Sequence, residues 1–198
     1  MDYTAGINQY IDLEISVLQK LDHQEINTLM NAIEAARLQE ATIYIMGNGG
    51  SGSTASHFTN DFNKGISEHI DPKFRFTCLN DNMATVMAIA NDIGYDAVFE
   101  FQLRGKVAKG DLVIGISGSG NSVNVLKAIE YAKAAGATTA GLTGYDGGKL
   151  RKLVDISVHV PVMSMQVTED IHMVFDHLMM SVLYKELCGI DHIKEGGK

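Results

Sequence analysis

The spacing of apolar positions changes along the chain. Over residues 6–20 and 25–40 apolar side chains recur at intervals of three and four, as Ile7, Ile11 and Ile15 do in the first stretch. This spacing is typical of amphipathic helices, so two helices are predicted at the N-terminal end. Beyond them, short apolar runs rich in β-branched residues alternate with helical patterns. Such alternation is typical of strands buried in a parallel sheet.

These patterns predict an α/β fold, a three-layer sandwich in which a five-stranded parallel sheet is flanked by helices. One domain is expected over 1–198, with N-terminal helices in 1–40 and the α/β core and terminal helix in 41–198. Strands are predicted at 41–46, 73–79, 112–117, 137–143 and 155–162. Helices are predicted at 82–90, 95–108, 122–135, 148–153 and 169–188.

The 20 glycines of this 198-residue chain exceed average usage of about 7%. Many lie in three loops that follow predicted strands: GNGGSGS (47–53), SGSGNS (117–122) and TGYDGG (143–148). Ligands of open α/β sheets bind outside the carboxyl ends of the strands, so these loops mark the functional edge.

The loop 117–122 places three hydroxyls before a predicted helix, where free backbone N–H groups and the helix dipole favour a phosphate. A glycine-rich turn with serine caps is the structural alternative. The loop 47–53 matches G-x-G-x-x-G, yet the nearest acidic candidate, Asp81, stands about ten residues too late for a dinucleotide site. No nucleotide cofactor is expected.

Charge and apolar runs restrict the partners and the location. The formal net charge of −8 is the wrong sign for a surface that neutralises nucleic-acid phosphates. The chain contains no run near the ~18 apolar residues of a membrane span and begins with a polar stretch. We expect a cytoplasmic protein with reduced Cys78 and Cys188, bound neither to nucleic acid nor to a membrane.

Two helical stretches carry histidines beside carboxylates. His57 and Asp61 stand four residues apart, and Glu169, His172 and His177 lie in EDIHMVFDH. A structural role is favoured for His172. A histidine and a carboxylate suffice for proton abstraction next to a carbonyl, and two of each are able to bind zinc.

Spacing restricts a shared metal site. Glu169 and His177 would be about 12 Å apart along one helix. Either Glu169 precedes that helix, or neighbouring subunits contribute separate ligands, and we prefer a site shared between subunits.

Five stretches in this order resemble the bacterial phosphoheptose isomerases of the sugar-isomerase (SIS) fold: GNGGSGSTASHF, AIANDIGYDAVF, GISGSGNSVNVLKAI, LTGYDGGKL and EDIHMVFDH. The resemblance implies an aldose–ketose isomerase, an intramolecular oxidoreductase that converts sedoheptulose 7-phosphate to D-glycero-D-manno-heptose 7-phosphate through an enediol. It also implies a homotetramer, or dimer of dimers, with sites between subunits and the N-terminal helices used in oligomerisation.

The same resemblance assigns roles to residues. Asp61 takes the position of the catalytic base and His177 that of its partner. Some members bind zinc at the positions held here by His57, Asp61, Glu169 and His177. The positions expected to bind the sugar and its phosphate are Asn48, Gly49, Gly50, Ser51, Asn91, Asp92, Ser117, Gly118, Ser119, Ser122 and Glu169.

Three positions depart from the family's pattern. Its catalytic glutamate is Asp61 here, its terminal-helix glutamine is Glu169, and Gly65 stands near a usual arginine. A zinc site with two carboxylates and two imidazoles would be more anionic than the family's. These departures leave the particular sugar open.

The alternative hypothesis from another class is a non-catalytic phosphosugar-binding regulator. A relative of the isomerases acts as an adaptor of the bacterial replication initiator and shares the LTGYDGG stretch found at 142–148. That adaptor lacks the terminal-helix histidine, whereas His177 is present here. The presence of this histidine favours an enzyme over a regulator. A nicotinamide oxidoreductase is the third and least favoured hypothesis.

Overall fold

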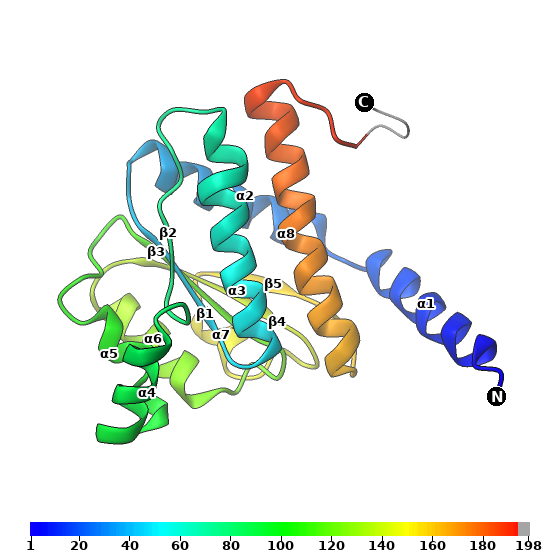
Figure 1. The fold of residues 1–198 in the computed structure, drawn as a ribbon, viewed down its shortest axis with the longest axis horizontal. Coiled ribbons are helices and arrows are strands. Elements are labelled where there is room, and N and C mark those ends of the chain that lie inside the picture. Colours follow the sequence, from blue (N-terminus) through cyan, green and yellow to red (C-terminus); the bar gives the residue numbers. More distant parts are fainter. Residues whose placement is uncertain (194–198) are drawn as a thin grey trace.

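The computed structural model describes residues 1–193 and contains one sheet of five parallel strands (Figure 1). The strands, in the spatial order β2-β1-β3-β4-β5, are β1 (Ile43–Gly47), β2 (Phe76–Cys78), β3 (Leu112–Ser117), β4 (Thr138–Thr143) and β5 (Ile156–His159). The predicted α/β fold with a five-stranded parallel sheet is therefore confirmed. The last part of the predicted domain, 194–198, lies outside the described residues.

Helices cover both faces of the sheet. They are α1 (Thr4–Leu18), α2 (His23–Leu38), α3 (Gly50–Asn60), α4 (Met83–Asp92), α5 (Glu100–Leu103), α6 (Val123–Ala134), α7 (Leu150–Leu153) and α8 (Met165–Cys188). A π-helical turn (Asp61–Gly65) continues α3, and 3-10 turns occupy Ile66–Glu68 and Tyr95–Ala97.

Alternating residues of β1 divide the core between the two faces. Ile43 and Ile45 pack with α2, α3 and α8, whereas Tyr44 and Met46 pack with α4, α5, α6 and α7. This alternation follows from the two-residue period of a strand. Within the described residues, none of the helices has the length and apolar character that a membrane span requires.

Several predicted elements are shorter than expected, among them β2 and α7, and in two other cases a single residue explains the difference. The helix predicted at 95–108 is broken into a 3-10 turn and α5, and Gly105, with a φ of 68°, cannot continue a right-handed helix. The strand predicted at 155–162 ends at His159, because Pro161 has no N–H to donate to a ladder.

The terminal helix is longer than the predicted 169–188. It begins at Met165, after Ser164 in an extended conformation, so Glu169 lies inside a continuous helix. The alternative that Glu169 precedes this helix is therefore wrong.

The strand order reverses between β1 and β3, because the chain passes from β1 outward to β2 and then returns to the other side of β1. Such a switch point opens a crevice at the carboxyl ends of the two strands. The loops that leave β1 and β3 are the glycine-rich segments 47–53 and 117–122.

The loop 117–122 rests against the loop that follows β4. A Cβ on Gly120, whose φ is 65°, would lie 2.0 Å from the carbonyl oxygen of Gly147. Gly120 also accepts a hydrogen bond from the amide of Leu150 (2.9 Å). Close backbone contact between these two loops therefore requires glycine at position 120.

We expect Gly120→Ala to destabilise the fold more than Gly105→Ala. Both positions have positive φ, 65° and 68°, but a Cβ at Gly105 meets nothing within 4 Å. Gly105→Ala should therefore cost only backbone strain of about 1 kcal/mol, and Gly120→Ala at least about 2 kcal/mol more, because the clash is with backbone. Urea unfolding measures both, and equal losses would contradict the predicted clash.

Candidate active site

Two serine hydroxyls meet in the loop between β3 and α6. Ser117 Oγ lies 3.0 Å from Ser122 Oγ, and Ser117 is 3% exposed. The loop is held from behind by the segment after β4, since the amide of Gly144 donates to the carbonyl of Gly118 (2.8 Å). The two serine hydroxyls therefore lie next to the N-terminal backbone amides of α6. Together these groups are suited to donate hydrogen bonds to an anion.

The loop between β1 and α3 is fixed through the side chain of Asn80. Its Nδ2 donates to the carbonyl of Gly47 (2.8 Å), and its Oδ1 accepts from the amide of Gly47 (3.2 Å). Gly49 has a φ of 55°, and α3 begins at Gly50, followed by the buried Ser51. Nothing in the sequence pattern around β2 connects Asn80 to this loop, so the sequence alone does not predict its role.

Asn48 is held by two further residues that the sequence analysis did not identify. Its side-chain amide and that of the buried Asn124 exchange hydrogen bonds of 2.9 and 2.8 Å. Tyr95 donates its hydroxyl to Asn48 Oδ1 (2.8 Å). These contacts connect the loops of β1 and β3 across the crevice and fix the orientation of Asn48.

Glu169 and the pair Asn91–Asp92 lie in different places. A Cβ on Gly50 would lie 2.4 Å from Glu169 Oε2, so this carboxylate sits against the first turn of α3, where the helix dipole favours an anion. Asn91 and Asp92 are exposed at the end of α4, and Asn91 Nδ2 donates to Asp92 Oδ1 (2.7 Å). In the described part of the chain no polar contact joins that pair to the three loops.

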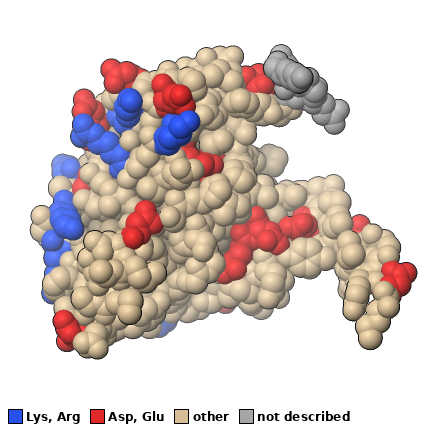
Figure 2. All heavy atoms as spheres, in the orientation of Figure 1, with Lys and Arg blue, Asp and Glu red and all other residues tan. Residues whose placement is uncertain are grey.

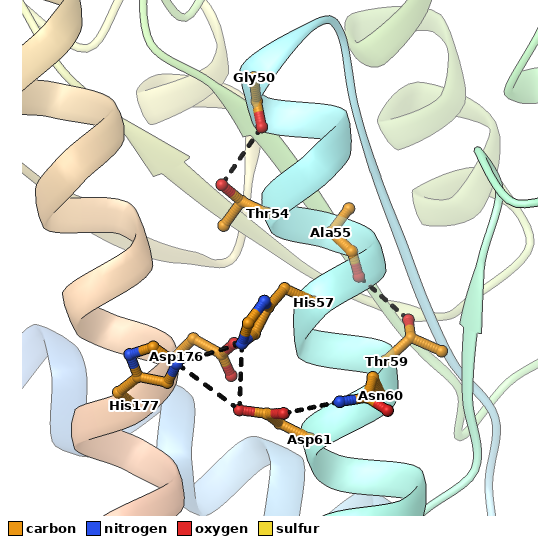
Figure 3. A network of polar contacts seen from close by, with 9 residues as sticks. All are labelled: Gly50, Thr54, Ala55, His57, Thr59, Asn60, Asp61, Asp176 and His177. Carbon is orange, nitrogen blue, oxygen red and sulfur yellow. Dashed lines mark hydrogen bonds and ion pairs between the residues drawn. The ribbon is translucent and has the colours of Figure 1, made fainter.

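A second cluster lies between α3 and α8, where His57 and Asp61 face His177 (Figure 3). His57 Nε2 is 3.1 Å from His177 Nε2 and 3.4 Å from Asp61 Oδ2. His177 Nε2 is 3.8 Å from the same carboxylate oxygen, and Asn60 Nδ2 donates to Asp61 Oδ1 (2.9 Å). Asp61 Oδ2 is thus directed between two imidazoles.

Asp176 is the member of this cluster that the sequence analysis missed. Its Oδ2 is 3.9 Å from His57 Nε2, and the side chain is fully buried. Neither carboxylate oxygen has a hydrogen-bond partner among the described residues. Burial, and next the charge of Asp61, raise the pKa of Asp176 to about 8.

Four ligand atoms of the cluster, one each from His57, Asp61, Asp176 and His177, lie within 4.8 Å of one another. Three of these residues belong to the predicted zinc set, and Asp176 stands in place of Glu169. Along the continuous α8, Glu169 and His177 are about 12 Å apart. A single chain therefore gathers two imidazoles and two carboxylates without Glu169.

Basic and acidic side chains are distributed unevenly on the face in Figure 2. Most of the visible Lys and Arg lie on the left side, whereas only Asp and Glu are visible over the right side, where α1 projects. With a net charge of −8, the protein must hold an anion by local hydrogen bonds. The serine loop and the N-terminal turns of α3 and α6 supply such donors.

His172 lies deep in the interior between the cluster and the loops. The residue is fully buried and its ring packs beside Phe175 at a centroid distance of 6.1 Å. Burial lowers the pKa of His172 to about 4, against the effect of the Thr143 carbonyl. The imidazole is therefore neutral at neutral pH.

Comparisons with known proteins agree with the fold described above. A family model described as the SIS domain matches residues 8–144. A phosphoheptose isomerase of Aliarcobacter butzleri is 37% identical over an alignment of 179 residues, and the match covers 84% of this chain and 94% of that protein. A phosphoheptose isomerase structure from Neisseria gonorrhoeae has a TM-score of 0.84 and 26% identity, covering 92% of this chain and 98% of that chain. One from Francisella tularensis has a TM-score of 0.86 and 25% identity, covering 94% and 100%.

We expect acid to destabilise the protein through His172. The folded-state pKa of about 4 lies below the ordinary value of 6.5, so the unfolded chain binds a proton between these values and the folded one does not. The free energy of unfolding should therefore fall as pH drops from 6.5 towards 4, by up to about 3 kcal/mol from this group.

His172→Gln should reduce this loss, and denaturant unfolding at several pH values measures it. His23→Gln, at an exposed position of α2, is the control and should leave the pH profile unchanged. Parallel profiles for the wild type and His172→Gln would contradict the assignment.

Proposed function

This chain belongs to the SIS-domain phosphoheptose isomerase family, and we propose that it interconverts sedoheptulose 7-phosphate and D-glycero-D-manno-heptose 7-phosphate. The proposal rests on the position of Asp61 between two histidines. Its Oδ2 lies 3.4 Å from His57 Nε2 and 3.8 Å from His177 Nε2. A carboxylate beside imidazoles is suited to moving protons between adjacent carbon and oxygen atoms.

The phosphate of the sugar is assigned to the loop after β3. Ser117, Ser119 and Ser122 supply hydroxyls, and Gly118 allows the backbone to approach the ligand. The loop 48–51 faces the same crevice at the β1/β3 switch point and is assigned to the sugar, with Asn48 oriented by Asn124 and Tyr95.

The carboxylate of Asp61 takes the proton from the carbon next to the carbonyl, and the electrons of that C–H bond form the enediol. His177 donates a proton to the carbonyl oxygen and removes one from the neighbouring hydroxyl. Asp61 then returns its proton to the former carbonyl carbon, which completes the isomerisation without an external oxidant.

The cluster between α3 and α8 also contains side chains of the types that bind divalent metal ions. His57, Asp61 and His177 would hold the ion, and the unpartnered oxygens of buried Asp176 fit a cation nearby. The chemistry supplied by a bound divalent cation is polarisation of the carbonyl and hydroxyl oxygens, which would replace the proton transfers by His177.

A homotetramer with sites between subunits is part of the proposal. The helix α1 projects from the rest of the chain (Figure 1), and its apolar residues are exposed: Ile7, Ile11, Leu13 and Ile15 are 41–55% exposed. A second copy of the chain would cover this helix. Assembly would also bring Asn91, Asp92 and Glu169 to the sugar-binding part of a neighbour's site.

We expect Asp61→Asn and His177→Ala each to lower kcat at least about 100-fold, because each removes a group that moves a proton. Turnover of sedoheptulose 7-phosphate, followed by formation of the aldose, measures the effect. Glu40→Gln is the control, since Glu40 forms only an exposed ion pair with Arg75. Full activity in both site variants would show that the assignment is wrong.

We expect Ser119→Ala and Ser122→Ala each to raise KM about tenfold, since each removes a hydrogen bond to a charged group. Their effect on kcat should be smaller. Thr28→Ala removes a hydroxyl from exposed α2 and should change neither constant. Loss of kcat at unchanged KM would place the phosphate elsewhere.

A further inference from the structure

The cluster between α3 and α8 contains a carboxylate, Asp176, that takes no part in the proton transfers described above. Asp176 is 0% exposed, and neither Oδ1 nor Oδ2 has a hydrogen-bond partner among the described residues. A buried, unpaired carboxylate costs several kcal/mol. Its oxygens are directed to the same space as three groups that bind metals (Figure 3).

We propose that Asp176 is a direct ligand of a divalent transition metal, completing a four-ligand site with His57, Asp61 and His177 of one chain. The set contains two imidazole nitrogens and two carboxylate oxygens, donors that Zn²⁺ accepts in tetrahedral sites. A divalent cation with two carboxylates and two neutral imidazoles gives zero net charge, which suits a site with a fully buried member.

The separations of the ligand atoms fit such a site. Bonds of about 2.0–2.1 Å to zinc place tetrahedral ligands about 3.3 Å apart. The contacts from His57 Nε2 are 3.1 Å to His177, 3.4 Å to Asp61 and 3.9 Å to Asp176. All four ligand atoms lie within 4.8 Å of one another, so side-chain shifts of about 1 Å would bring them to tetrahedral separations.

Glu169 is the competing candidate for the fourth position. It lies seven residues before Asp176 on the continuous helix α8, which corresponds to about 10 Å along the axis. Its carboxylate contacts Gly50 at the beginning of α3. Within one chain, Asp176 therefore reaches the other ligands and Glu169 does not.

The test is a metal titration of the full-length protein without any sugar. The wild type, Asp176→Asn, Glu169→Gln and Glu186→Gln are stripped with a chelator, and Zn²⁺ binding is measured by calorimetry. Glu186 is an exposed carboxylate on α8 and serves as the matched control. The wild type should bind one Zn²⁺ per chain, Asp176→Asn at least about tenfold more weakly, and the other two variants as the wild type does.

Cobalt provides a second readout, because its visible bands report the ligands around the ion. The Co²⁺ spectrum should change in Asp176→Asn and stay the same in Glu169→Gln. If Asp176→Asn does not fold, Asp176→Glu keeps the charge but lengthens the arm, and a changed spectrum is again expected.

Three results would overturn the proposal: no Zn²⁺ binding by the wild type, wild-type affinity in Asp176→Asn, or loss of affinity in Glu169→Gln equal to that in Asp176→Asn. An unchanged Co²⁺ spectrum in Asp176→Glu would do the same. Since the titration contains no sugar, its outcome is separate from whether the chain isomerises a phosphoheptose.

Discussion

The packing of α3 against α8 is the contact on which the candidate active site depends. On α3 the buried Phe58 stands between His57 and Asp61, and on α8 the buried Phe175 precedes Asp176 and His177. The apolar side chains therefore fix the register of the polar ones. One residue of helix rises 1.5 Å, so a slip of a single position would separate atoms that now lie 3–4 Å apart.

An acidic protein is able to bind a phosphate because the donors are local. The parallel sheet brings the N-terminal turns of α3 and α6 to one edge, and glycines in the loops let backbone and ligand approach each other. The contact between Gly120 and Gly147 fixes the serine loop at that edge. No Lys or Arg side chain is then needed to bind a phosphate at the serine loop. The rest of the surface is able to carry the net negative charge.

Periodicity and glycine clusters are local signals, so the sequence predicted the sheet and the three loops. The pairing of Asp61 with His177 was implied instead by the resemblance to phosphoheptose isomerases. The sequence did not predict Asp176. Thr168, His172 and Asp176 recur every four residues and are all buried, so they form a polar stripe beside the apolar stripe of α8. Read alone, Thr168 and Asp176 suggest an exposed face, and only the tertiary packing shows that they are covered. Thr168 lies against Gly118 and Gly144, and Asp176 lies beside His57. Contacts such as Asn80 with Gly47 connect distant segments and leave no local pattern.

The two carboxylates of the cluster have different physical tasks. Asp61 is largely buried, but it accepts a hydrogen bond from Asn60 and lies close to the imidazoles of His57 and His177. These contacts partly compensate its negative charge. Asp176 has no hydrogen bonds of this kind. Without a bound cation, its protonated, neutral form has the lower free energy in this buried position. An ion bound by Asp176 would remove that constraint. Because aspartate at position 61 has a shorter reach than glutamate, a second carboxylate from the facing helix would also complete the coordination that the shorter arm leaves open.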